Sequence, residues 1–343
     1  MHSPSRILIF QTAFLGDVIL TLPLVQVIHR EFPAAEIDVV ATPAAGELLR
    51  NHPAVHRTII YDKRGAQRGV LGMWSLASEL RGRTYDIALV PHRSLRSAVV
   101  TALAGIPVRV AFETSAGRFL FTDLVVYDKH AHEVDRNFSF LKPFNIGHPH
   151  IELPSLYPSP QDVEKVTTFL FVNHIAKDES IVAIAPGSVW NTKRWPAERF
   201  SGLVRMLVRG GKKVVLLGGE EDERLCREIA ESAGNPAVLI AAGKLSILQS
   251  AELIRRCALI VTNDSAPMHL AVAMQVPVVA IFGATVPAFG FAPYGEKDVV
   301  VETEGLTCRP CSIHGGDKCP IGTFECMWKI SPETVLLKTA TIA

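Results

Sequence analysis

The chain has 343 residues, 48% hydrophobic and 20% charged, which is enough for two domains with well-filled cores. Its formal net charge of +1 excludes a nucleic-acid binder that depends on a broad basic surface, so a small-molecule ligand is the better expectation. Residues 1–6 lack the apolar stretch and cleavage site of a secretory signal peptide, which predicts a cytoplasmic protein.

The first half of the chain alternates short β-branched runs with helical patterns, which is typical of parallel α/β sheets. The predicted strands are 6–10, 36–42, 57–61, 86–91 and 108–112. The helical patterns between them cover 18–32 and 44–53.

A proline-rich stretch, HPHIELPSLYPSPQD (148–162), follows this first half. Proline at this density stiffens an extended connection rather than forming a core element. We therefore predict one domain over residues 1–160 and a second over 161–343.

The alternation of strands and helices resumes in the second half. The predicted strands are 181–187, 213–219, 237–243, 259–264 and 277–283, and the predicted helices are 196–211, 222–234, 246–257 and 265–276. Five strands in each half predict two doubly wound domains whose facing strand-end loops form a ligand cleft. As an alternative for the C-terminus, the last helix packs back on the first domain.

Residues 270–295 carry no charged side chain and by length alone would span a bilayer. Prolines and glycines interrupt this stretch, including Pro277 and Gly283. A buried helix running into a strand covered on both faces explains it better.

Asp17 stands where the first predicted strand gives way to a helix, in the stretch FLGDVILTLP. An aspartate at a helix start complements the helix dipole and can cap the free N–H groups. The same carboxylate at the mouth of a cleft is also suited to general-base catalysis. No GxGxxG fingerprint follows this strand, so a dinucleotide site of the dehydrogenase type is not expected here.

Two strand-end loops of the second half are suited to phosphate. Lys193 can neutralise phosphate charge, although a solvated surface lysine is the simpler interpretation. The helix that starts after Asp264 offers N–H groups to an anion. His269, one turn further in, is either a ligand or a core histidine.

A third loop of this half contains the acidic run 220–223. Glu220 and Glu221 are candidates for hydrogen bonds to ribose hydroxyls, and they are also ordinary complements of a helix dipole. For Asp222 and Glu223 we favour the dipole interpretation.

Three motifs in the same order resemble the heptosyltransferases of glycosyltransferase family 9, closest to the branch that adds the second heptose. They are LGDVILTLP (15–23), PGS-x₄-KRWP (186–196) and TNDS-x₂-MHLA (262–271). The resemblance implies a GT-B fold, with the acceptor on the first domain and a nucleotide sugar on the second. It also implies transfer of heptose from ADP-heptose to a lipid-linked inner core of lipopolysaccharide, with no cofactor and no nucleic-acid partner.

The resemblance also assigns roles to residues of the motifs. It makes Asp17 the catalytic base and Lys193 the partner of the leaving diphosphate, in an inverting reaction that needs no metal. It places the donor against Ser188, Leu245, Asp264, Ser265, Ala266 and His269. Ala266 and Pro267 depart from the Gly-Leu that is common in the family, and proline offers no N–H.

The acceptor side of the sequence is less distinctive. The loops of the first domain carry basic residues suited to carboxylates and phosphates, namely Lys63, Arg64, Arg93, Arg96 and Arg118. Each of them alone is typical of a surface. Peripheral contact with the cytoplasmic face of the inner membrane would suit a lipid-linked acceptor, yet the sequence shows no basic amphipathic helix of the interfacial kind.

Four cysteines form the pattern C-x₂-C-x₇-C-x₆-C, namely Cys308, Cys311, Cys319 and Cys326. Four thiolates can hold a structural zinc ion, but the spacing is loose for a zinc ribbon. Reduced loop thiols are the first expectation, with zinc as the alternative.

Other functions stay open at this point. A transferase of the same fold with a different nucleotide sugar is the nearest. A sugar-nucleotide epimerase or hydrolase would need no acceptor and no base from the first domain. A non-enzymatic nucleotide-binding or zinc-binding module is the third.

Overall fold

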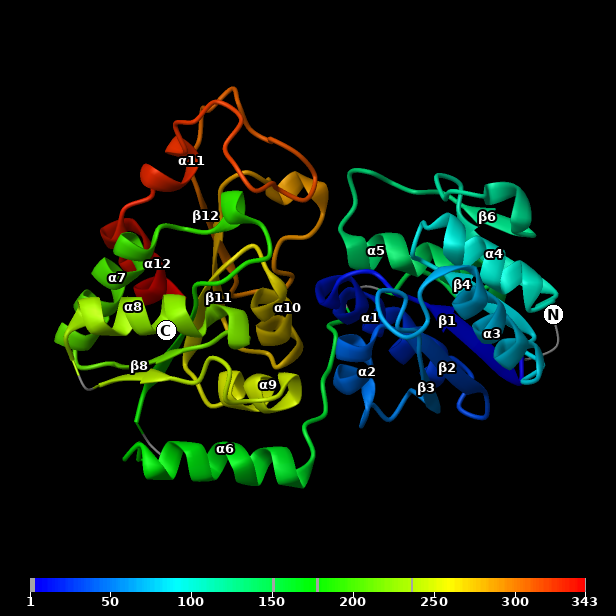
Figure 1. Cartoon of the computed structure of the whole chain (residues 1–343), viewed down its shortest axis with the longest axis horizontal. Helices are drawn as coiled ribbons and strands as arrows, with labels where there is room; N and C mark the ends of the chain where they lie inside the picture. The colour runs from blue at the N-terminus through cyan, green and yellow to red at the C-terminus, as the bar shows by residue number, and fades with distance from the viewer. Residues whose placement is uncertain (1–3, 150–151, 177–178, 236, 343) are drawn as a thin grey trace. The chain divides into compact units, whose positions relative to one another are not determined.

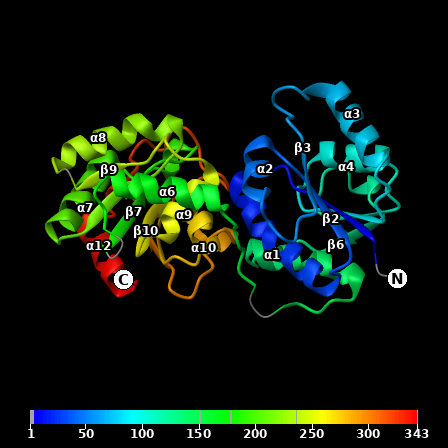
Figure 2. The same ribbon diagram turned by 90° about the horizontal axis from the view of Figure 1, so that it is seen from below.

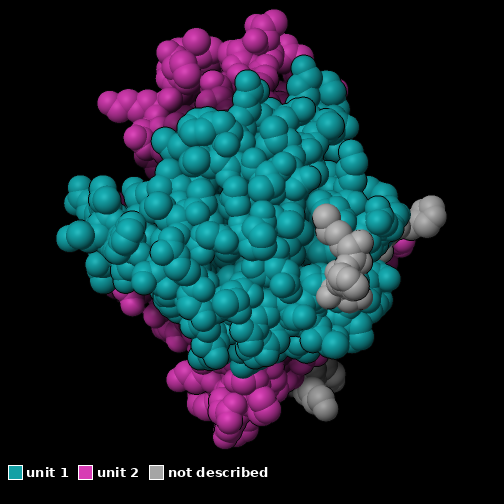
Figure 3. Space-filling view, turned by 90° about the vertical axis from the view of Figure 1, so that its right-hand side faces the viewer, with its two compact units in different colours: residues 1–157 teal, residues 158–343 magenta. Residues whose placement is uncertain are grey.

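The computed structural model describes residues 4–149, 152–176, 179–235 and 237–342. The chain divides into two compact units, residues 1–157 and 158–343, which Figure 3 shows in different colours. This division falls three residues before the boundary expected from the proline-rich stretch.

The first unit is built on a parallel six-stranded sheet with the order β3-β2-β1-β4-β5-β6 (Figure 1). Its strands are β1 (Arg6–Phe10), β2 (Glu36–Ala41), β3 (Arg57–Ile60), β4 (Ile87–Val90), β5 (Val108–Phe112) and β6 (Asp123–Val125). Its helices are α1 (Leu15–Glu31), α2 (Pro43–Leu49), α3 (Gly69–Arg81), α4 (Leu95–Leu103) and α5 (Glu133–Phe138), with short 3₁₀ turns η1 (Arg118–Leu120) and η2 (Ser139–Phe144).

Helices cover both faces of this sheet (Figures 1 and 2). α3 and α4 pack together on one face, and α1 packs with α2 and α5 on the other. Successive side chains of β1 point to opposite faces of the sheet, so both faces need a layer of helices. Leu8 and Phe10 belong to the core cluster under α3 and α4, whereas Ile7 and Ile9 are buried outside that cluster.

The second unit repeats the same plan with the strand order β12-β11-β10-β7-β8-β9. Its strands are β7 (Ile181–Ala185), β8 (Lys213–Leu216), β9 (Val238–Ile240), β10 (Leu259–Asn263), β11 (Val278–Phe282) and β12 (Val299–Glu302). Its helices are α6 (Pro160–Val172), α7 (Ala197–Arg209), α8 (Glu223–Ala233), α9 (Ile247–Arg255), α10 (Ala266–Ala273), α11 (Glu325–Trp328) and α12 (Pro332–Ile342), with 3₁₀ turns η3 (Asn191–Lys193), η4 (Glu220–Asp222) and η5 (Pro287–Phe289).

Both sheets have the doubly wound order 3-2-1-4-5-6 when the strands are counted from the start of each unit. The α/β class and the pair of Rossmann-like sheets expected from the sequence are confirmed. Each sheet has six strands rather than the five predicted, because β6 is only three residues long and β12 follows a charged loop.

Two predicted features need correction. α1 begins at Leu15, before the predicted start at 18, so Asp17 lies inside its first turn. Pro160 does not belong to an extended linker but opens α6, where Ser159 caps the helix and exchanges hydrogen bonds with Asp162. The last helix, α12, packs against α7 within the second unit.

The uncharged stretch 270–295 forms the end of α10, the buried strand β11 and the turn η5. In the part of the chain that the structure describes, none of the helices combines the length and the apolar character needed to cross a bilayer.

Candidate active site

In the first unit, the strand order reverses between β1 and β4, which is where open α/β sheets bind ligands. The loops that follow these two strands are joined there, since the Thr12 hydroxyl and Nδ1 of His92 lie 3.0 Å apart. Lys63, from the loop after β3, donates a hydrogen bond to the Thr12 carbonyl oxygen. Three strand-end loops therefore meet at the switch point of the first sheet.

Asp17 is held in place by the start of α1. Its carboxylate accepts a hydrogen bond from the backbone N–H of Phe14 at 3.0 Å, so it satisfies one of the free donors at the helix start. The side chain is partly exposed, which leaves it open to a ligand. Asp17 therefore has the expected position at the start of a helix, and this position is compatible with a catalytic role.

The guanidinium group of Arg93 lies over an aromatic ring, that of Tyr127. Its guanidinium lies 4.1 Å from the centre of the Tyr127 ring, and that of Arg136 lies 4.8 Å from the same ring. Burial, the Glu133 carboxylate and, to a lesser degree, Asp17 raise the pKa of Tyr127, against the opposing effects of the two arginines. Tyr127 thus lies within electrostatic reach of Asp17.

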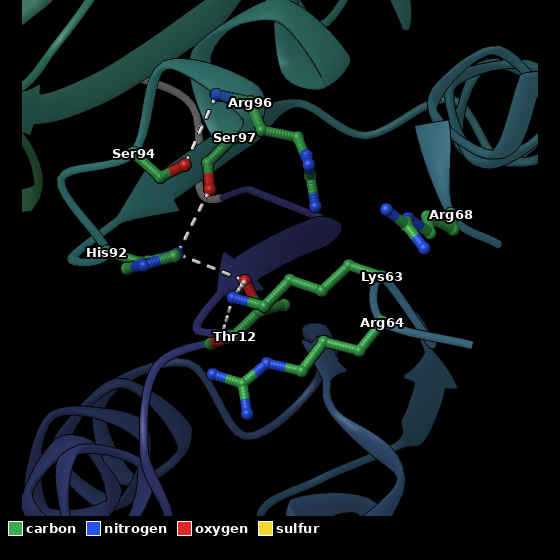
Figure 4. A pocket seen from close by; sticks show the side chains of 8 residues that line it. All are labelled: Thr12, Lys63, Arg64, Arg68, His92, Ser94, Arg96 and Ser97. Carbon is green, nitrogen blue, oxygen red and sulfur yellow. Dashed lines mark hydrogen bonds between the residues drawn. The ribbon is translucent and has the colours of Figure 1, made fainter. Parts of the chain in front are cut away.

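A basic pocket of about 330 Å³ opens at the same switch point (Figure 4). Its lining consists of cationic, hydroxyl and imidazole side chains, namely Thr12, Lys63, Arg64, Arg68, His92, Ser94, Arg96 and Ser97. None of these eight residues is acidic. Burial and the nearby cations Arg64 and Arg96 lower the pKa of Lys63.

The pocket also contains a histidine held in its neutral form. Burial, helped by Lys63 and two arginines, lowers the pKa of His92 to about 4. The structure thus brings together Lys63, Arg64 and Arg96 of the predicted acceptor set and adds Arg68 and His92. Arg93 and Arg118 do not line the pocket.

In the second unit, the strand order reverses between β7 and β10. Lys193, after β7, forms an ion pair with Asp264, after β10, with 2.6 Å between Nζ and Oδ2. The Thr285 hydroxyl donates to the same carboxylate oxygen at 2.7 Å. Both charged side chains are largely buried, which fixes the ammonium group at the end of the sheet.

Asn263 fixes the two loops relative to each other. Its side-chain oxygen accepts the backbone N–H of Trp195 at 3.0 Å, and its amide group donates to the Pro186 carbonyl at 2.8 Å. Trp195 is itself fully buried and anchors the loop that carries Lys193. Asn263 was not among the predicted site residues, although it stands in the TNDS motif.

The residues predicted to bind an anion lie at the start of α10. Ser265 is the extended residue before the helix, Ala266 is its first residue and Pro267 its second. His269 is buried within this helix, as both the ligand and the core interpretations allow. Ser188 is half-buried after β7, and its carbonyl oxygen accepts a hydrogen bond from Arg194 at 2.7 Å.

In the acidic run 220–223, the residue that packs at the strand ends is not one of the two predicted as site residues. Glu220 and Glu221 are exposed in η4, whereas the Asp222 carboxylate is folded against the ends of β7 and β8. It accepts the Gly219 N–H at 3.2 Å, and burial raises its pKa. Leu245, half-buried before α9, belongs to the next loop along this edge.

The cysteine-rich segment is hydrogen-bonded to the loop that carries Lys193. Gly316 accepts the Thr192 N–H at 3.0 Å and returns its own N–H to the Thr192 hydroxyl at 2.8 Å, next to Lys193. Within residues 4–149, 152–176, 179–235 and 237–342, no three His, Cys, Asp or Glu side chains are placed to hold a metal ion. Burial and the other three thiols of the pattern raise the pKa of Cys326, so Cys308, Cys311, Cys319 and Cys326 lie within electrostatic reach of one another, and the zinc alternative stays a prediction.

Comparison with known proteins identifies the family. The model of glycosyltransferase family 9 (heptosyltransferase) matches residues 73–316, more than half of the chain. The chain belongs to glycosyltransferase family 9.

Relatives of this family-9 chain are similar over nearly their full length. It is 29% identical to lipopolysaccharide heptosyltransferase 2 of Escherichia coli K12, over 96% of both chains. It is 27% identical to lipooligosaccharide heptosyltransferase 2 of Haemophilus influenzae, over 97% of this chain and 98% of the relative.

Solved structures agree with this assignment. The E. coli ADP-heptose heptosyltransferase II superposes with a TM-score of 0.79 at 26% identity and covers 98% of each chain. A family-9 glycosyltransferase from Veillonella parvula superposes with a TM-score of 0.89 at 24% identity, which supports the fold. The family-9 chain is therefore a glycosyltransferase with the GT-B fold.

Proposed function

We propose that this glycosyltransferase moves a heptose from ADP-heptose to a lipid-linked inner core of lipopolysaccharide, at the cytoplasmic face of the inner membrane. Names of relatives in both comparisons support the sugar and the acceptor, since they are lipopolysaccharide or lipooligosaccharide heptosyltransferases. The observation that carries the proposal is the buried Lys193–Asp264 pair, which sets a cation at the ligand-binding edge of the second sheet.

In the proposed reaction, the second unit, residues 158–343, holds the donor. Lys193 and the N–H groups at the start of α10 neutralise the diphosphate as it leaves. Asp264 positions the ammonium group through the 2.6 Å contact, and Thr285 fixes Asp264 in turn. Ser188 lies in the loop after β7, whereas Ser265, Ala266 and His269 lie at or within the start of α10. Leu245 is proposed to lie against the adenine.

The first unit, residues 1–157, supplies the base and the acceptor site. Asp17 removes the proton of an acceptor hydroxyl while that oxygen forms a bond to the anomeric carbon of the heptose. The bond from this carbon to the diphosphate breaks on the opposite side, so the configuration inverts. The basic pocket around Lys63, Arg64 and Arg96 is proposed to hold an anionic group of the inner core.

Lysine and backbone dipoles supply the electrostatic assistance in this proposal. We therefore expect protein treated with a chelator to retain its transferase activity. Loss of activity that returns on addition of a divalent cation would contradict this part of the proposal.

The role of Lys193 is tested by Lys193→Met, which keeps the length of the side chain and removes the charge. We expect turnover to fall by about 10² or more and ADP to bind more weakly, because a preorganised charge is lost. Lys338→Met is the matched control, since Lys338 is exposed on α12. Wild-type turnover and ADP affinity in Lys193→Met would refute the proposed role.

A further inference from the structure

The first two turns of α3 expose three large apolar side chains. Val70, Leu71 and Trp74 are 78%, 84% and 60% exposed. The opposite side of the same helix is buried against the sheet, through Leu76, Ala77 and Leu80. These three side chains therefore project largely into solvent rather than into the core.

Only the N-terminal end of the solvent-facing side of α3 is apolar. Further along the helix, the exposed residues are Ser75, Ser78, Glu79 and Arg81. Val70, Leu71 and Trp74 thus form a local apolar patch at the N-terminal end of the helix. The folding of the unit does not explain why this patch is exposed.

The apolar patch directly follows a cationic loop in the chain. Residues 63–78 contain the cations Lys63, Arg64 and Arg68 and no acidic residue. Arg64 and Arg68 are exposed, and both also line the basic pocket. Figure 4 shows these cations around the pocket together with Arg96.

Apolar side chains beside arginines, with a tryptophan among them, match the chemistry of an anionic membrane surface. The apolar groups enter the boundary between headgroups and acyl chains, where the amphipathic indole ring is favoured. Lysine and arginine beside them are attracted to anionic headgroups. A two-fold contact between copies is less suitable, because it would bring the cations of two like-charged loops together, and the neighbouring Asp62 carboxylate already accepts the backbone N–H groups of Gly65 and Ala66.

We propose that residues 63–74 form a docking surface for an anionic phospholipid bilayer. Val70, Leu71 and Trp74 insert at the headgroup boundary, and Arg64 and Arg68 contact lipid phosphates. The inference rests on the proposed function in one respect, since a lipid-linked acceptor must be met at a membrane. The surface would bring the basic pocket, which shares the two arginines, to the headgroup layer.

The test is co-sedimentation of the full chain with vesicles, without donor or acceptor. Vesicles of phosphatidylcholine alone are compared with vesicles that also contain phosphatidylglycerol. We expect binding to the anionic vesicles, weakened by salt, and a partition coefficient lowered about tenfold or more in Val70→Ser/Leu71→Ser/Trp74→Ser. Phe171→Ser is the control, since Phe171 is 79% exposed on α6 in the other unit.

Two results of this experiment would overturn the inference. One is the absence of wild-type binding to anionic vesicles, and the other is unchanged binding of the triple variant. A concentration-dependent dimer in solution that the triple variant abolishes, without vesicle binding, would assign the surface to a second copy instead.

Fluorescence locates the insertion. Lipids brominated on their acyl chains should quench part of the emission of the wild-type protein, and Trp74→Phe should remove that part while vesicle binding is kept. Quenching that is equal in both proteins would contradict insertion at α3.

Activity separates this inference from the proposed function. With a delipidated, soluble acceptor, the triple variant should turn over as the wild type does, since it changes no residue of the pocket. Vesicle binding without any heptosyl transfer would leave the docking surface standing and refute the proposed function.

Discussion

The carboxylate of Asp17 caps the start of α1 and has a proposed role as the catalytic base, and one substitution can separate the two roles. Asparagine at this position keeps a side-chain oxygen that can accept the Phe14 N–H, so the start of α1 stays capped, while the negative charge is lost. We expect Asp17→Asn to lower turnover by about 10²–10⁴, the range of general-base catalysis, with ADP affinity unchanged. Steady-state kinetics and calorimetric titration with ADP measure the two quantities.

The control for Asp17→Asn is its thermal stability. A variant that unfolds with the wild type but turns over slowly has lost chemistry rather than structure. Turnover close to the wild-type value would exclude Asp17 as the base and would favour an epimerase or hydrolase.

His92 makes the stability of the protein depend on pH. Its pKa is lowered from an ordinary value of 6.5 to about 4 in the folded state, because burial disfavours the charged form. The unfolded chain binds the proton more readily, so this contribution is fully present above pH 6.5 and is lost as the pH falls toward 4. The shift corresponds to about 3 kcal/mol.

Urea unfolding between pH 7 and pH 4 measures this effect. We expect the free energy of unfolding to fall over this range and to fall less steeply in His92→Asn. His52, whose pKa burial also lowers to about 4, contributes in the same direction and remains in the variant. His174→Asn is the control at an exposed position, and an equal slope in the wild type and His92→Asn would contradict the assignment.

At the scale of elements, the ends of β7 and β8 form a close contact with η4. A Cβ atom on Gly218 would lie 2.5 Å from Cβ of Asp222, and one on Gly187 would lie 2.2 Å from its carboxylate. A carboxylate can rotate away, but Cβ of Asp222 moves only with the backbone of η4. We expect Gly218→Ala to cost about 1–3 kcal/mol of stability, as overpacking does.

Denaturant unfolding of single and double variants measures this coupling. The cost of Gly218→Ala should persist in an Asp222→Ala background and fall in Asp222→Gly, which removes the clashing Cβ. Gly82→Ala is the control, since an alanine there meets only ordinary contacts at 3.5 Å or more. A neutral Gly218→Ala would show that η4 is not held against the strands.

The elements also show what local patterns can predict. Strands buried on both faces, such as β7 and β10, are continuous apolar runs, so their place in the chain is evident. α3 was missed because Gly69 and Gly72 lie in its first turn and a tryptophan and a valine face the solvent. The docking surface was missed with it, since a solvent-facing apolar side chain does not follow the periodicity of a buried face.

At the scale of the whole molecule, the sequence predicts two doubly wound units because each half repeats the strand and helix alternation. It does not predict which distant residues meet. Thr285 lies on the chain 21 residues beyond Asp264, and only the fold brings its hydroxyl to that carboxylate. His92 joins Lys63, Arg64 and Arg68 for the same reason, since it follows β4 and the three cations follow β3.

The most direct test of the account is product analysis with ADP-heptose and a truncated inner-core acceptor. Mass spectrometry should find an acceptor that has gained one heptose, and NMR should show an anomeric configuration opposite to that of the donor. Both signals should accumulate about 10²-fold or more slowly in Asp17→Asn and in Lys193→Met. Free heptose without an extended acceptor, or a product with retained configuration, would contradict the account.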